Sequence, residues 1–164
     1  HQPPFLSFNI LLYYPLSEEL TMIEEFITDI CELLKIEVPK ISYDTSHFHT
    51  KTTLAQCEPT VNIIYLTKID KPNTDYIFSI AHELRHIYQY QTDDEFYLSG
   101  YKPSNKCSSI EEYNLQIAEV DANAFASIIM VEYFSMKPQW NGLSDKVINA
   151  IDNRINIIIH ELNN

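Results

Sequence analysis

The sequence predicts a single α+β domain, built in the order of one helix, a small sheet of about three strands, and three further helices. Three observations predict this class. Apolar residues recur at helical spacing near both ends and in the middle of the chain. Short runs rich in β-branched residues, separated by turn residues, lie between the first two helical segments. A length of 164 residues with 45% hydrophobic content supports one core, whereas two independent domains would each be small.

The first helix is expected to begin at Ser17 and to end before Val38 and Pro39, because proline disfavours a helical conformation in the residue that precedes it. Its apolar residues predict a core-facing stripe of Leu20, Ile23, Phe26, Ile27, Ile30 and Leu34. The preceding segment, Phe5–Tyr14, is apolar and aromatic. It predicts either an edge strand or a stretch that lies against the core.

Two or three strands are predicted after this helix, and the candidates are Val38–Tyr43, Lys51–Gln56 and Val61–Leu66. Turn-rich pieces such as Cys57–Pro59 separate them. The pattern leaves open whether the second or the third strand forms the sheet edge beside the next helix.

The next helix carries a His-Glu-x-x-His motif formed by His82, Glu83 and His86. Its apolar residues gather into one stripe of Ile77, Ile80, Ala81, Leu84, Ile87 and Tyr88. The two histidines fall roughly opposite this stripe, with Glu83 at its edge. Because residues four apart lie one turn above each other, the imidazoles can hold one metal ion between them. The alternative is a chance coincidence on an exposed face, and a third ligand would count against it.

A second long helix is predicted to open with Ser109 and Glu112, which form a capping-box signature, and to continue to Tyr133 or Phe134. From Ile117 onward this helix is apolar nearly all round. The connection that precedes it, from Gln91 to Cys107, is long, polar and acidic. It is interpreted as either a lid or substrate rim, or a plain linker.

Glu119 is the candidate third ligand, because an acid in an apolar helix needs a partner. Ala122 and Ala126 lie beside it on the helical wheel, so another helix could approach closely there. The alternatives are a solvated face or an ion pair with Arg85 or Lys106, but the metal motif favours the ligand role.

Two further polar residues interrupt the same helix. Asn123 lies one turn beyond Glu119, where it would hold a ligand imidazole by its distal ring nitrogen. Asp121 points to a different side and is expected to be structural.

The two motifs together, over about residues 75–131, resemble the ImmA/IrrE family of metallopeptidases, which share the gluzincin ligand arrangement. The resemblance implies a zincin-like fold, zinc (Zn2+) bound by His82, His86 and Glu119, and Glu83 as the catalytic base. Several members of that family cleave transcriptional repressors of mobile elements or of stress responses. The resemblance therefore implies a zinc endopeptidase with a narrow regulatory protein or peptide substrate.

Two residues depart from the usual zinc-peptidase pattern. Arg85 stands where many zinc peptidases have a small residue, and Asn123 stands where an aspartate is common in gluzincins. The segment that directly follows His86, Ile87–Thr92, contains neither the glycine nor the third histidine of metzincins. For stabilising the oxyanion of the reaction, Tyr113 and Arg85 are the candidates near the motifs.

Two other functions are compatible with the same motifs. The chain could be a binding module that keeps the fold without catalysis, or a structural zinc protein whose fourth ligand position is closed by another side chain.

Composition narrows the function classes further. A net charge of −12 argues against a nucleic-acid partner, because such proteins concentrate lysine and arginine. Neither a membrane span nor a secretory signal is visible. The cysteines, Cys31, Cys57 and Cys107, are odd in number and widely spaced, which favours free thiols and a cytoplasmic location. The first residue, His1, is compatible with a piece of a longer protein.

The last helix is expected to be capped by Ser144, after the break at Pro138. Its packing stripe is predicted to comprise Val147, Ile148, Ile151, Ile155, Ile158 and Leu162.

Overall fold

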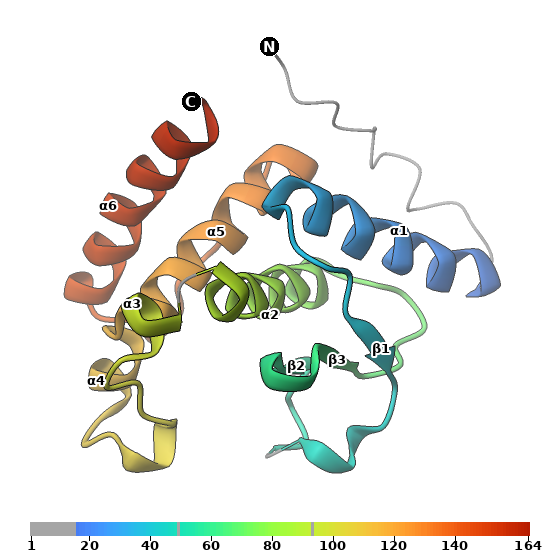
Figure 1. Ribbon diagram of the computed structural model, residues 1–164, viewed down its shortest axis with the longest axis horizontal. Helices are drawn as coiled ribbons and strands as arrows, with labels where there is room; N and C mark the ends of the chain where they lie inside the picture. Colours follow the sequence, from blue (N-terminus) through green and yellow to red (C-terminus); the bar gives the residue numbers. More distant parts are fainter. Residues whose placement is uncertain (1–15, 49, 93) are drawn as a thin grey trace.

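The computed structural model describes residues 16–48, 50–92 and 94–164 (Figure 1). Within these ranges the chain forms six α-helices and one three-stranded mixed sheet, so the predicted α+β class is confirmed. One helix precedes the sheet as predicted, but five helices follow it where three were expected. The expectation of an edge strand or a packed stretch at Phe5–Tyr14 lies outside the described residues.

The helices are α1 (Leu16–Leu34), α2 (Thr74–Thr92), α3 (Asp94–Leu98), α4 (Ile110–Asn114), α5 (Ile117–Phe134) and α6 (Asp145–Leu162). The strands are β1 (Lys40–Ser42), β2 (Ala55–Glu58) and β3 (Ile63–Leu66). Short 3-10 turns occupy Thr45–His47, Pro59–Val61 and Ser104–Lys106. Each strand is shorter than its predicted range.

The sheet has the order β1-β3-β2, with β3 in the centre. Strand β1 runs parallel to β3, with Ile41 opposite Ile64, and β2 runs antiparallel to it, with Cys57 opposite the same residue. The prediction of a turn at Cys57–Pro59 was therefore wrong for Cys57 and Glu58, which belong to β2. Because β3 is paired on both sides, β2 is the edge strand that lies against α2.

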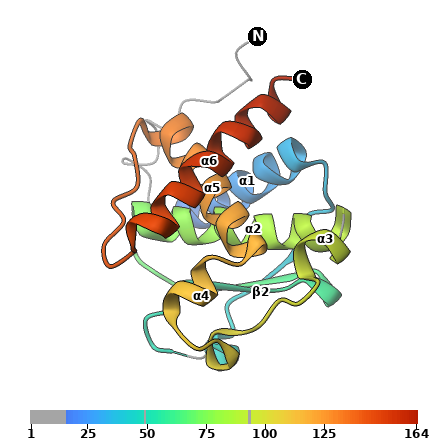
Figure 2. The same ribbon diagram turned by 90° about the vertical axis from the view of Figure 1, so that its left-hand side faces the viewer.

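Helix α2 runs through the middle of the molecule, with the sheet on one side and helices α1 and α5 on the other (Figures 1 and 2). The predicted stripe lies in the core: five of its members are buried and Tyr88 is half-buried. Asn73 caps the first turn, because its Oδ1 accepts a hydrogen bond from the Tyr76 amide at 2.9 Å. The stripe anchors α2 and leaves its other face for the site.

The prediction of one continuous helix from Ser109 to about Phe134 was wrong, because the chain breaks into α4 and α5. Ser109 does cap α4, since its Oγ accepts from the Glu112 amide at 3.0 Å. Gln116 then adopts an extended conformation, and α5 begins after it. The side-chain amide of Gln116 bonds both main-chain groups of Lys102, accepting from its N–H at 2.7 Å and donating to its carbonyl at 2.9 Å. This tertiary contact stabilises the break.

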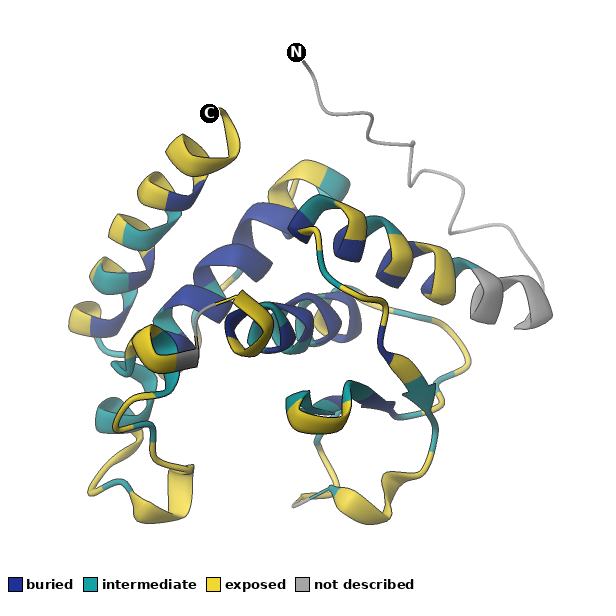
Figure 3. Cartoon of the chain, in the orientation of Figure 1, coloured by how far each residue is buried: buried dark blue, intermediate teal, exposed yellow. Residues whose placement is uncertain are grey.

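Helix α5 is buried along most of its length, and α6 covers its outer side (Figure 3). Ser144 caps α6 as expected, because its Oγ accepts from the Val147 amide at 3.4 Å. Of the predicted stripe of α6, Val147, Ile151 and Ile158 are buried, whereas Leu162 is exposed and does not pack. Among the described residues, no helix combines the length and the apolar character needed to cross a membrane.

The carboxylate of Asp121 on α5 joins three helices in the interior. Its Oδ2 accepts from Arg85 Nε at 2.7 Å, and its Oδ1 accepts from Arg154 Nε on α6 at 2.8 Å. Gln89 Nε2 donates to the same carboxylate at 2.8 Å. Burial would raise the pKa of Asp121, but the hydrogen bonds and the charge of Arg85 hold it below its ordinary value. The structural role expected for Asp121 agrees with this geometry.

Replacing Asp121→Asn should lower the free energy of unfolding by roughly 3–5 kcal/mol, because it leaves two arginines beside a neutral group in the interior. Urea denaturation measures this change. The matched control is Asp152→Asn on the exposed side of α6, for which we expect a change within about 0.5 kcal/mol. Equal losses in the two variants would contradict a special role for Asp121.

Candidate metal centre

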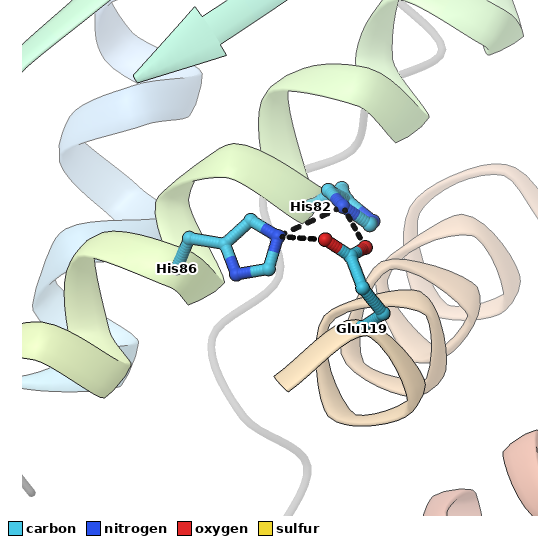
Figure 4. Close-up of side chains that lie close together, drawn as sticks. All are labelled: His82, His86 and Glu119. Atoms are coloured by element: carbon cyan, nitrogen blue, oxygen red, sulfur yellow. Dashed lines mark hydrogen bonds and ion pairs between the residues drawn. The ribbon is translucent and has the colours of Figure 1, made fainter. Parts of the chain in front are cut away.

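Three predicted ligands meet where α2 faces α5 (Figure 4). The Nε2 atoms of His82 and His86 lie 3.0 Å apart. Glu119, in the first turn of α5, approaches them with Oε2 at 3.2 Å from His82 Nε2 and Oε1 at 3.3 Å from His86 Nε2. Glu119 is almost fully buried, with 3% of its side chain exposed, whereas the two imidazoles are 16% and 14% exposed. One atom from each residue can therefore reach a common point.

Asn123 takes the position predicted for it. Its Oδ1 lies 2.9 Å from Nδ1 of His82, the ring nitrogen that faces away from the other ligands. An amide oxygen accepts a hydrogen bond there, so Nδ1 carries the proton and Nε2 keeps its lone pair for a metal.

The side chain of Gln89 holds the distal ring nitrogen of His86 in the same way, and the sequence analysis did not predict this contact. The NH2 group of Gln89 faces two acceptors, the carbonyl of Ala118 at 2.9 Å and the carboxylate of Asp121. Its Oε1 must therefore face Nδ1 of His86, at 2.8 Å. This hydrogen bond leaves Nε2 of His86 directed at the site. The available signal was the position of Gln89, one turn beyond His86 on the same helix.

The charges of His86 and Glu119 depend on each other. Burial would lower the pKa of His86, but the hydrogen bond and charge of Glu119 outweigh it and raise this pKa to about 9. Burial would raise the pKa of Glu119, but its hydrogen bonds to both imidazoles hold it well below the ordinary range. Glu119 is therefore an anion, and a proton on His86 balances its charge.

The imidazoles open into a cleft of about 510 Å³. Its floor contains His82, Glu83, His86 and Glu119, and β2 lines one side. The opposite wall comes from Leu98 at the end of α3 and from the connection between α3 and α4, through Tyr101, Pro103 and Ser104. The connection from residue 91 to 107 was interpreted as a lid or substrate rim, or as a plain linker. Because its residues line the cleft, the structure agrees with a rim.

Glu83, the predicted base, lies in this cleft beside the ligands. The thiol of Cys57 on β2 faces it. Burial raises the pKa of Cys57 well above its ordinary value, and the charge of Glu83 and a hydrogen bond with it raise it further. Cys57 is thus a neutral neighbour of Glu83, which the sequence did not indicate. Cys31, Cys57 and Cys107 are all free thiols, as expected.

Arg85 is not available to the cleft. Its guanidinium is buried, paired with Asp121, and lies over the rings of Tyr88 and Phe125. It therefore neither pairs with Glu119 nor can stabilise an oxyanion, so that candidate role was wrong. Tyr113 does line the cleft, as does Tyr101, a residue that sequence reasoning did not single out.

The donor set fits a zinc ion. Zinc takes imidazole nitrogen and carboxylate oxygen, and two histidines with one glutamate are a ligand set of catalytic zinc sites. Here both imidazoles have their distal nitrogens engaged by amide oxygens, which orients their Nε2 atoms inward. The possible metal ligands in this cluster of described residues are His82, His86 and Glu119.

Comparisons of the chain with known protein families, with curated proteins and with solved structures returned no match.

Gln89→Leu should weaken zinc binding by about 10- to 100-fold, because His86 loses the acceptor that holds its Nδ1 proton. Competition with a chromogenic chelator measures the affinity. Gln91→Leu is the matched control, because Gln91 lies on the same helix and contacts Glu37 and Asn62 instead. An affinity unchanged in Gln89→Leu would contradict this role.

Zinc binding at pH 7 should release about one proton. With a pKa of about 9, His86 is protonated in the metal-free protein, and zinc needs the lone pair of its Nε2. The affinity should therefore rise with pH and level off above about 9. Calorimetry in two buffers of different ionisation enthalpy counts the proton, and equal heats in both buffers would show that none is released.

Proposed function

We propose that this protein is a zinc-dependent endopeptidase with a zincin-like fold, of the ImmA/IrrE type. The observation that carries the proposal is the convergence of His82, His86 and Glu119 at the floor of an open cleft, with Glu83 beside them. The arrangement has the parts that metal-assisted hydrolysis requires: ligands, a base and access for a substrate.

Bound zinc supplies Lewis acidity, which activates water at neutral pH and polarises a carbonyl group. The residues of the chain supply the rest. Glu83 accepts the proton of the attacking water and passes it to the nitrogen of the leaving amine. Asn123 and Gln89 keep the two imidazoles in the required tautomer. Tyr113, the remaining sequence-derived candidate for stabilising the oxyanion, lines the cleft, but its hydroxyl donates its one proton to Glu119 at 2.7 Å and is not free for this role.

The substrate is expected to bind as an extended segment along β2. This strand is the edge of the sheet next to α2, and Ala55, Gln56 and Cys57 line the cleft. An edge strand offers main-chain groups with which a peptide can pair. Apart from the two histidines, the charged side chains among the described residues that line the cleft are Glu83 and Glu119. This described lining contains no lysine or arginine that could bind the C-terminal carboxylate of a peptide. This favours cleavage within a chain.

The two alternative functions are less well supported. A structural zinc site would be enclosed, whereas both imidazoles reach the cleft. A module without catalysis would not need a carboxylate at the position of Glu83. We further propose a narrow regulatory substrate, such as a repressor of a mobile element or of a stress response, and no nucleic-acid or membrane partner. The free cysteines support a cytoplasmic location.

Glu83→Gln should lower the rate of peptide cleavage by about 10²- to 10⁴-fold, because the amide cannot accept a proton. Zinc-loaded proteins are incubated with a proteome-derived peptide library, and new termini are counted by mass spectrometry. The variant should still bind one zinc per chain, because Glu83 is not a ligand.

The matched control is Glu58→Gln at the end of β2, which should cleave like the wild type. Equal cleavage by wild type and Glu83→Gln would remove the catalytic claim. Protein purified without chelator that contains no stoichiometric zinc would remove the metal site altogether.

A further inference from the structure

Two phenol hydroxyls converge on one oxygen of Glu119. Tyr101 donates to Oε1 at 2.8 Å and Tyr113 donates to the same atom at 2.7 Å. The two hydroxyls lie 3.3 Å apart. Oε2 faces the other way, toward His82 at 3.2 Å. The two oxygens of the third ligand therefore have different surroundings.

The hydrogen-bonding capacity of a carboxylate determines which oxygen of Glu119 is left to bind a metal ion. Each carboxylate oxygen has about two lone-pair sites. Oε1 accepts two short bonds from the phenols and also lies 3.3 Å from Nε2 of His86, so its hydrogen-bonding capacity is already in use. Oε2 keeps its lone pairs for a metal ion. Coordination through Oε2 alone leaves room for a fourth ligand that does not come from the protein.

The two tyrosines come from separate parts of the cleft wall. Tyr101 follows α3 in the connection, and Tyr113 belongs to α4. The two parts are tied together next to these residues, because Gln116 bonds both main-chain groups of Lys102, and Lys102 Nζ lies 3.4 Å from Glu112 Oε1. Both hydroxyls are thus held over Glu119 by the fold of the wall.

We propose that Tyr101 and Tyr113 are a pair of positioning residues that bind Oε1 of Glu119 and so direct the carboxylate to the metal through Oε2 alone. The pair sets both the affinity of the site and the number of protein atoms around the ion. This rests on the metal-binding part of the proposed function and does not depend on catalysis.

The test compares Tyr101→Phe, Tyr113→Phe and the double variant with the wild type. Two properties are measured: zinc affinity, by competition with a chromogenic chelator, and the visible absorption of the protein loaded with Co2+. Phenylalanine removes only the hydroxyl, so far-UV circular dichroism should be unchanged. Tyr90→Phe is the matched control, because Tyr90 lines the same cleft and its hydroxyl is not one of the two donors to Glu119.

We expect the double variant to bind zinc about 10- to 100-fold more weakly, with a smaller loss in each single variant. Its Co2+ absorption should fall in intensity, because Glu119 can then coordinate through both oxygens and a higher coordination number absorbs more weakly. Wild-type affinity and spectrum in the double variant would overturn the proposal, and so would an equal loss in Tyr90→Phe. A wild type that binds neither ion would instead overturn the metal site itself.

Discussion

The buried carboxylate of Asp121 is the interaction on which the rest of this structure depends. A charge in the interior is tolerated only when it is paired and fully hydrogen-bonded. Asp121 meets this condition by accepting bonds from Arg85 and Gln89 on α2 and from Arg154 on α6. Helices α2, α5 and α6 must therefore keep one mutual arrangement. Because Gln89 also holds His86, that arrangement reaches the metal centre.

The metal centre is consequently a property of two packed helices. Helix α2 contributes both imidazoles and α5 contributes Glu119, while the distal nitrogens are held by Gln89 from α2 and Asn123 from α5. Ala118, Ala122 and Ala126 are fully buried on α5, and their small side chains permit a close approach of the helices. Rigid helices with locked side chains hold ligands more precisely than loops do.

The cleft wall is attached to this rigid part by polar contacts. Tyr101 and Tyr113 bond to Glu119, and Gln116 joins the connection to the start of α5. The wall thus meets the core at the ligand itself. The position of the Glu119 carboxylate therefore depends on the order of this segment.

The sequence by itself determined the α+β class with one helix before a small sheet, the core-facing side of α2, and the set His82, His86, Glu119 and Asn123, because helical periodicity decides which residues share a face. Only the tertiary structure decided the features that rest on contacts distant in the chain. The break before α5 depends on the bonds between Gln116 and Lys102, with no glycine or proline to mark it. The edge position of β2 depends on the pairing order of the strands. Tyr101 reaches Glu119 from an irregular connection, whose path no periodicity encodes.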